Sequence, residues 1–121
     1  MSKIRVAALG LVAVAMLAWA VPALAQPKRA ASTISVTAGK PAEFKFTLSA
    51  SSVKHGTVTF NITNSGALAH DFSINGKKTA LIQPKKSGTL TVTFAKAGSY
   101  PYQCTVPGHA AAGMKGTLKV T

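Results

Sequence analysis

The sequence predicts an all-β fold, a Greek-key β-sandwich or barrel of about seven or eight short strands. Three observations predict it. Along several segments apolar residues alternate with threonine, serine or lysine, which is the pattern of a strand with one buried face. Glycine, proline and asparagine mark turns between these segments. Beyond the N-terminal apolar run, no segment of about ten residues or more has a convincing helical pattern.

The strand-like segments follow one another through the whole chain after residue 31. In chain order they are 34–36, 44–48, 58–62, 90–94 and 118–120. A short strand is expected at 72–74, and the residue pattern at 80–82 allows another. Turn signals separate them at 38–41, 54–56, 64–66, 75–76, 83–88 and 96–98. Each segment is expected to place its apolar residues in one core and its threonines and lysines in solvent.

The N-terminal segment has the composition of an export signal. Lys3 and Arg5 precede an apolar run at 6–20, and Pro22-Ala23-Leu24-Ala25 supplies small residues for cleavage. An uncleaved membrane anchor is the alternative, but this run is short for a bilayer span of about 20 residues. Gln26, and not a cysteine, directly follows the cleavage site, so a lipoprotein anchor is not expected. The expected division is a signal peptide at 1–25, a flexible lead at 26–31 and one domain at 32–121, exported to the periplasm.

The charge of the chain is strongly positive. The formal net charge is +12, and Glu43 and Asp71 are the only acidic residues. The lysines are spread along the chain without interleaved aromatic residues, whereas a nucleic-acid surface is usually denser and more aromatic. The sequence therefore predicts a solvated basic surface, which could also steer an acidic protein partner toward the molecule. No nucleic-acid partner is expected.

The chemically distinctive residues lie near the C-terminus. Cys104, His109 and Met114 are each separated from the next by four residues. Cys104 is the only cysteine, so it cannot form an internal disulfide, and Met114 is the only methionine outside the first twenty residues. A thiolate, an imidazole and a thioether in one loop are the ligand types that copper prefers.

A fourth ligand would have to come from another segment, and the remaining histidines are the candidates. His55 lies in a polar turn, where a solvated histidine is expected. His70 follows an apolar approach and precedes a predicted strand, so it would be held firmly at one end of the fold. We therefore predict His70 as the ligand, with a partly buried structural histidine as the alternative.

The donor set favours copper over other metals. Two imidazoles and one thiolate give a trigonal plane, with a thioether at a longer axial distance. Structural zinc sites are usually completed by cysteine, histidine or carboxylate ligands and not by a thioether. Covalent haem attachment calls for Cys-x-x-Cys-His, which the sequence lacks.

The loop Cys104-Thr105-Val106-Pro107-Gly108-His109, with Gly113-Met114 after it, resembles the ligand loop of the cupredoxins, the small blue-copper proteins. The upstream His70, the strand pattern and a last strand after Met114 are similar to that family as well. The resemblance implies a cupredoxin-like domain with one type 1 copper ion. Its equatorial ligands would be His70, Cys104 and His109, and its axial ligand would be Met114.

The residue after His70 departs from the family pattern. Many cupredoxins have asparagine there, and its side chain ties the two ligand-bearing loops together, whereas this chain has Asp71. Asp71 could accept hydrogen bonds from backbone N–H groups near Cys104 or Thr105. The alternative is an ordinary exposed acid.

The resemblance implies a function for the site and a surface through which electrons would pass. His109 would present its ring edge as the electron port, because the residues around it are small or apolar and uncharged. A loop packed only for space is the alternative. We predict a soluble, monomeric periplasmic electron carrier, not an enzyme. Its partners would be redox proteins, such as a cytochrome, an oxidase or a reductase with an acidic docking surface.

Four other functions are alternatives to electron transfer. The same four ligands could serve copper storage or delivery, although the chain has no Met/His-rich tail. A nucleophilic enzyme using Cys104 and a histidine would leave Met114 unexplained and lacks an oxyanion motif. A metal-free sandwich that binds a protein partner would leave the placement of sulfur to chance. A copper oxidase or nitrite reductase needs more histidines than the three present.

Overall fold

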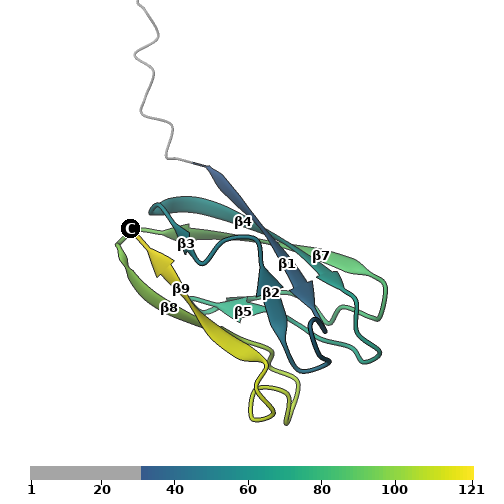
Figure 1. Ribbon diagram of the computed structural model, residues 1–121. Coiled ribbons are helices and arrows are strands. Elements are labelled where there is room, and N and C mark those ends of the chain that lie inside the picture. The colour runs from purple at the N-terminus through teal and green to yellow at the C-terminus, as the bar shows by residue number, and fades with distance from the viewer. Residues whose placement is uncertain (1–30) are drawn as a thin grey trace, which may run out of the picture.

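The structure, a computed structural model, describes residues 31–121. These residues form a sandwich of two β-sheets (Figure 1). The predicted signal peptide at 1–25, and all of the predicted lead except Ala31, lie outside the described residues. In the described part the strands are β1 Ser32–Ala38, β2 Phe46–Leu48, β3 Ser52–Val53, β4 Gly56–Asn64, β5 Ser73–Ile74, β6 Lys77–Lys78, β7 Ser87–Phe94, β8 Gly98–Gln103 and β9 Lys115–Val120. The all-β sandwich prediction is confirmed.

The first sheet has the strand order β2-β1-β4-β7. Its centre is the parallel pair of β1 and β4, which runs in register from Ser32 opposite Val58 to Ala38 opposite Asn64. β2 and β7 pair antiparallel on the two sides. β4 therefore ends at Asn64 with a partner on each side, and this firmly held end leads directly into the segment that carries His70.

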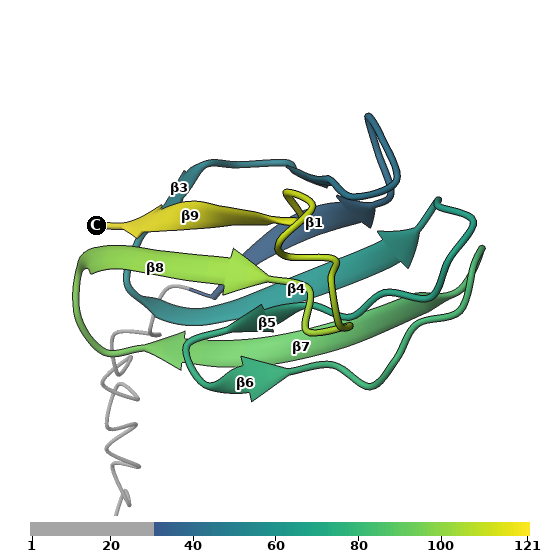
Figure 2. The same cartoon turned by 90° about the horizontal axis from the view of Figure 1, so that it is seen from below.

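The second sheet has the strand order β3-β9-β8-β5-β6. β8 and β9 pair antiparallel from Gly98 opposite Val120 to Gln103 opposite Lys115. Figure 2 shows the connection between them as a long loop that runs from the end of β8 to the start of β9. The register brings residues 104 and 114 side by side at the open end of this pair, with the predicted ligand loop between them.

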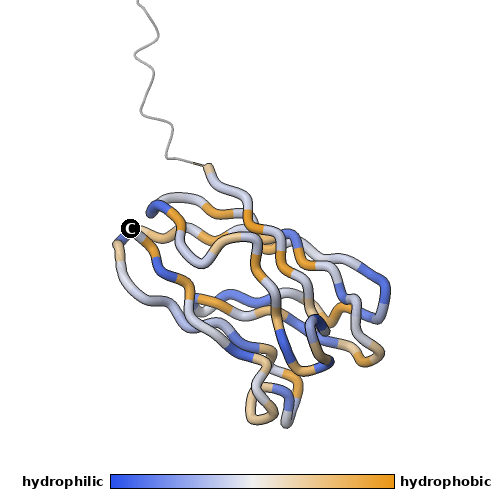
Figure 3. The backbone as a smooth tube through the Cα atoms, viewed as in Figure 1, coloured by the Kyte–Doolittle hydropathy of each residue, from blue (hydrophilic) through white to orange (hydrophobic). Residues whose placement is uncertain are grey.

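The core lies between the two sheets and is apolar. Buried and exposed residues alternate along β4 and β9, as the sequence predicts, and the same alternation is visible as changing colour along the tube in Figure 3. Three phenylalanines, Phe60, Phe72 and Phe94, are fully buried, and Phe60 packs against each of the other two. Tyr102 packs on Phe72 and Phe46.

The described part of the chain contains nine strands, more than the seven or eight predicted. Three strands have no counterpart among the predicted segments: β8, and the two-residue strands β3 and β6, which are too short for alternation to appear. β6 forms a hairpin with β5 through Asn75 and Gly76, whose positive φ angles of 51° and 73° suit a tight primed turn. The possible strand at 80–82 is instead one isolated bridge between Ile82 and His70.

Within residues 31–121 there is no helix with the length and apolar character needed to cross a membrane.

Candidate metal centre

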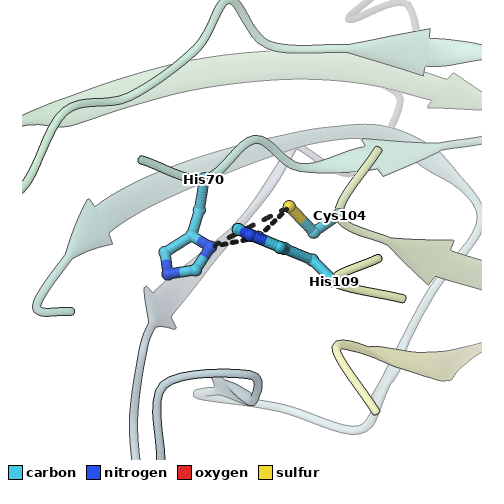
Figure 4. Close-up of side chains that lie close together, drawn as sticks. All are labelled: His70, Cys104 and His109. Atoms are coloured by element: carbon cyan, nitrogen blue, oxygen red, sulfur yellow. Dashed lines mark hydrogen bonds between the residues drawn. The ribbon is translucent and has the colours of Figure 1, made fainter. Parts of the chain in front are cut away.

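Three of the predicted ligands converge at one end of the sandwich: His70, Cys104 and His109 (Figure 4). The Nδ1 atoms of the two histidines lie 3.0 Å apart. The Cys104 Sγ atom lies 3.9 Å from His70 Nδ1 and 3.6 Å from His109 Nδ1. Two imidazole nitrogens and one thiol sulfur therefore face one point, and their donor atoms all lie within 4.8 Å of one another.

The loop between β8 and β9 is organised by its own backbone. Cys104 N–H donates to the Met114 carbonyl at 3.0 Å, and Met114 N–H donates to the His109 carbonyl at 3.1 Å. Between them, Ala112 N–H donates to the carbonyls of Gly108 and His109. The equal spacing in the sequence thus becomes a compact turn that joins the Cys, His and Met positions. Met114, which ends this turn, is fully buried.

His70 is held from both its backbone and its ring. Its backbone N–H and C=O exchange hydrogen bonds of 3.1 and 2.8 Å with Ile82, and its side chain is fully buried. The ring Nε2 lies 2.9 Å from Glu43 Oε1, and the ring Nδ1 faces Cys104 and His109. The prediction that His70, rather than His55, joins the loop residues matches this placement.

Glu43 is a member of the site that the sequence analysis did not identify. Besides the His70 ring, its carboxylate accepts the backbone N–H of Ala67 at 2.9 Å and of Leu68 at 2.8 Å. The Ala67 hydrogen bond is the main reason why the pKa of Glu43 lies below its ordinary value. The scarcity of acidic residues was the signal in the sequence that could have identified Glu43, because only two acids occur in the chain.

Asn64, at the end of β4, fixes the segment that leads to His70. Its Nδ2 donates to the Leu68 carbonyl at 2.8 Å and to the Ile82 carbonyl at 2.9 Å, and its Oδ1 accepts Gly66 N–H at 2.9 Å. The side chain is fully buried, and these bonds satisfy it. Sequence reasoning identified the segment 64–66 only as a turn.

Asp71 joins the His70 segment to the Cys104 loop. Its Oδ1 accepts Thr105 N–H at 2.5 Å, and its Oδ2 accepts the Thr105 hydroxyl. Its backbone N–H points to Cys104 Sγ at 3.5 Å. The residue is only 6% exposed, so the alternative of an ordinary exposed acid is wrong, and the expected hydrogen bond to the backbone near Cys104 is confirmed.

The environment of Cys104 determines the protonation of its thiol. Burial raises its pKa, the Asp71 charge adds to that rise, and the N–H groups of Asp71 and Val106 oppose it. A neutral thiol is therefore the stable form without a metal ion. A bound cation would favour the thiolate and release the proton.

The surroundings of His109 are apolar and partly open. Phe44 packs edge-on against the ring, with 5.0 Å between centroids. Leu68 is 47% exposed, an unusual exposure for a large apolar side chain in this protein. Pro107, Gly108, Ala111 and Ala112 are exposed, and none of them carries a charge. The cluster is thus closed toward the core and covered outward by a small apolar surface.

His55 lies away from the cluster. It precedes β4, at the opposite end of that strand from Asn64, and is exposed. Its ring Nδ1 lies 2.9 Å from the carbonyl of Thr121, beside a backbone hydrogen bond between the same residues. Its contacts are those of a histidine that ties down the C-terminal strand.

The donor set fits one soft or borderline metal ion. Two Nδ1 atoms and one Sγ atom are the nitrogen and thiolate donors of a trigonal copper site, and zinc accepts the same atom types. The closed core side and the hydrogen bonds to His70 and Cys104 would hold the donors in place whether or not an ion is bound.

Comparison with known proteins places this chain in a family. The family model described as "Cupredoxin-like domain" matches residues 10–120. Auracyanin-B from Chloroflexus aurantiacus is 51% identical over 43 residues, which are 36% of this chain and 18% of that protein. The copper-resistant cuproprotein CopI from Pseudomonas aeruginosa is 50% identical over 40 residues, 33% of this chain and 22% of that one. These matches span about a fifth of each relative's length.

Solved structures extend the likeness to most of the described residues. Auracyanin B has a TM-score of 0.63 at 26% identity, covering 77% of this chain and 90% of that one. Auracyanin A, a "blue" copper protein from Chloroflexus aurantiacus, has the same fold, with a TM-score of 0.62 at 24% identity over 75% of this chain and 99% of that one. The chain therefore belongs to the cupredoxin-like family.

Proposed function

We propose that this protein is a type 1 copper electron carrier. The observation that carries the proposal is the convergence of His70 Nδ1, Cys104 Sγ and His109 Nδ1 in a hydrogen-bonded frame. Copper bound there would supply a one-electron Cu(I)/Cu(II) couple. Hydrogen bonds that hold the donors in place in both oxidation states lower the reorganisation energy of electron transfer.

Met114 completes the proposed ligand set as the axial ligand. Its backbone is hydrogen-bonded to both Cys104 and His109, and the residue is buried. A thioether favours Cu(I), whereas imidazole and thiolate accept both oxidation states. The mixed set is therefore suited to a copper ion that changes its oxidation state.

The apolar surface around His109 is the proposed site of electron exit and entry. Small uncharged residues allow close approach of a partner and rapid release, as weak redox encounters require. Both acids of the chain are hydrogen-bonded within the site, and in the described part of the chain neither forms a salt bridge with a lysine. This charge supports a redox protein with an acidic docking surface as the partner, and not a nucleic acid.

The remaining parts of the proposal concern location and chemistry. The N-terminal pattern of charge, apolar run and small residues supports export to the periplasm. We infer a monomer, which is the default for a carrier of this size. We also infer that it performs no catalysis of its own, because the copper ligands and their supporting residues account for the polar groups of the site.

The first test is the visible spectrum of the purified protein after addition of Cu(II). We expect an intense thiolate-to-copper band that bleaches with ascorbate and returns on oxidation. Cys104→Ser should lack the band, while Ser99→Ala, an exposed change in β8, should keep it. A colourless protein that binds copper only as Cu(I) would contradict electron transfer by a type 1 site.

Copper storage or delivery is the second candidate. It is favoured by the likeness to CopI, which is named a copper-resistant cuproprotein. Mixing the Cu(I) protein with a competing chelator separates the two functions. A carrier should retain its copper through repeated oxidation and reduction, whereas a delivery protein should release it rapidly to the competitor.

A further inference from the structure

We propose that Glu43 is a positioning residue for the metal centre, and that its charge biases bound copper toward Cu(II). The inference rests on the proposed function, because it concerns copper at the same cluster. It adds a residue from the connection between β1 and β2, which supplies none of the predicted ligands. Glu43 acts through His70 and does not itself face the cluster's Nδ1 and Sγ atoms.

The first step of the argument is the state of the His70 ring. A carboxylate only accepts hydrogen bonds, so the contact of 2.9 Å between Glu43 Oε1 and His70 Nε2 places a proton on Nε2. A neutral ring with its proton on Nε2 has a free lone pair on Nδ1. That lone pair is the one aimed at Cys104 and His109. Glu43 therefore selects the tautomer and the ring orientation that a metal ligand needs.

The second step is that Glu43 is itself fixed. Its two carboxylate oxygens accept the backbone N–H groups of Ala67 and Leu68, in the same segment that carries His70. The carboxylate also lies against Gly66, where a Cβ atom would come within 2.7 Å of Oε1. The absence of a side chain at residue 66 thus makes room for the acid. A carboxylate held by three donors transmits a definite orientation to the imidazole.

The third step is the distribution of charge. Glu43 and Asp71 are the only acids of the chain, and both lie in the wall of this cluster. Among the described residues, the one basic side chain within salt-bridge distance of Glu43 is His70, whose neutral ring does not cancel the charge of the carboxylate. With the Cys104 thiolate, a bound ion would face three negative charges. Such an environment stabilises Cu(II) more than Cu(I), since the Coulomb energy scales with the charge of the ion.

A purely structural role is the competing explanation, in which Glu43 only ties two loops together. Glu43→Gln distinguishes the two explanations. The glutamine oxygen can still accept one N–H, so much of the geometry is kept while the charge is lost. Glu43→Ala removes the geometry as well. Ala95→Lys is the matched control, because it also raises the net charge by one, from an exposed position after β7 at the opposite end of the sandwich.

The experiment measures the ratio of Cu(II) to Cu(I) affinity from the midpoint potential of the copper-loaded full-length protein. We expect Glu43→Gln to shift this ratio toward Cu(I) by about tenfold. Ala95→Lys should shift it by less than about twofold, because solvent and salt screen a distant surface charge. Equal shifts in the two variants, or none in Glu43→Gln, would overturn the bias toward Cu(II).

A second readout tests the positioning without any change of oxidation state. Nitrogen-15 NMR of the diamagnetic Cu(I) protein should find the His70 proton on Nε2 and in slow exchange with water. Glu43→Ala should make that exchange at least tenfold faster, whereas Glu43→Asp should restore part of the protection. Unchanged exchange in Glu43→Ala would overturn the positioning role. Failure of the proposed function is distinguishable, since the wild-type protein itself would then lack a reversible copper band.

Discussion

The two segments that supply the cluster are held in different ways. The segment 65–71, which carries His70, is fixed mainly by the side chains of Asn64, Glu43 and Asp71. The loop 104–114 is fixed mainly by hydrogen bonds within its own backbone. The first segment is joined to residues distant in the sequence, namely Glu43, Ile82 and Thr105, whereas most of the second loop's hydrogen bonds are local. The cluster therefore combines a segment whose conformation depends on long-range side-chain contacts with a loop whose conformation depends on its own backbone hydrogen bonds.

This difference determines how substitutions should act. A side-chain clamp can be removed by one substitution, and the backbone groups that it served then lose that hydrogen-bond partner. A loop held by its own backbone has no such single side chain, and it is sensitive instead to residues that restrict its φ angles. The two segments should therefore respond to different kinds of change.

The largest expected effect is that of Asn64→Ala in the clamped segment. The substitution removes three hydrogen bonds. It leaves the Gly66 N–H and the Leu68 carbonyl without the Asn64 side chain, while the Ile82 carbonyl keeps only the N–H of His70. At about 1 kcal/mol for each bond, we expect the free energy of unfolding to fall by about 3 kcal/mol. Urea denaturation of the metal-free protein measures it.

The same strand offers a matched control. Asn61 is exposed in β4, and its amide oxygen has only a long contact of 3.4 Å with the Thr89 hydroxyl. Asn61→Ala should cost no more than about 0.5 kcal/mol. Equal losses for the two alanine variants would show that the clamp is not what stabilises the segment.

The link between the two segments should give the next largest effect. Asp71 accepts both the N–H and the hydroxyl of Thr105, so the pair couples the clamped segment to the self-supported loop. A double-mutant cycle of Asp71→Ala and Thr105→Val should give a coupling energy of about 1.5 kcal/mol in the free energy of unfolding. Purely additive losses would mean that the contact between the Thr105 hydroxyl and Asp71 does not couple the two segments.

A glycine substitution tests the self-supported loop. Gly108 has a φ of +83°, and a Cβ atom there would meet nothing within 4 Å, so the cost of Gly108→Ala is conformational alone. We expect a loss of about 1 kcal/mol in the free energy of unfolding. Gly98, which lacks a positive φ and has room for a Cβ atom, is the control, and Gly98→Ala should not destabilise the protein. Indifference to both changes would argue against a backbone-determined loop.

The same difference explains how far the sequence predicts the structure. The residue types of Cys104, His109 and Met114 and their spacing predict a metal loop, and the loop is local, so the pattern is visible in a few residues. Strand alternation predicts the sandwich and its core. It says nothing about which strands are neighbours, so the parallel pairs β1–β4 and β3–β9 could not be predicted from it.

The residues that the sequence analysis missed act over long separations. Glu43 is 24 positions from Ala67 and 27 from His70, and in the sequence it is a single acid among turn residues. The turn at Asn64 is recognisable, but the three hydrogen bonds of its side chain depend on how the segments 65–69 and 80–82 fold back over it. The contacts of Glu43 and Asn64 follow no repeat or fixed spacing in the sequence. The scarcity of acids was the only feature of the sequence that pointed to Glu43.

The smallest expected effect belongs to His55, the histidine outside both segments. Its ring contact with the Thr121 carbonyl is solvent-exposed, so His55→Ala should lower the free energy of unfolding by about 0.5 kcal/mol. The copper band and its bleaching by ascorbate should be unchanged, because the residue lies beyond the far end of β4 from Asn64. Spectra of His55→Ala and His70→Ala, recorded side by side with Cu(II), check the assignment. A weakened band in the first variant would mean that the two ends of the sandwich are coupled, and that the metal centre depends on more than its two segments.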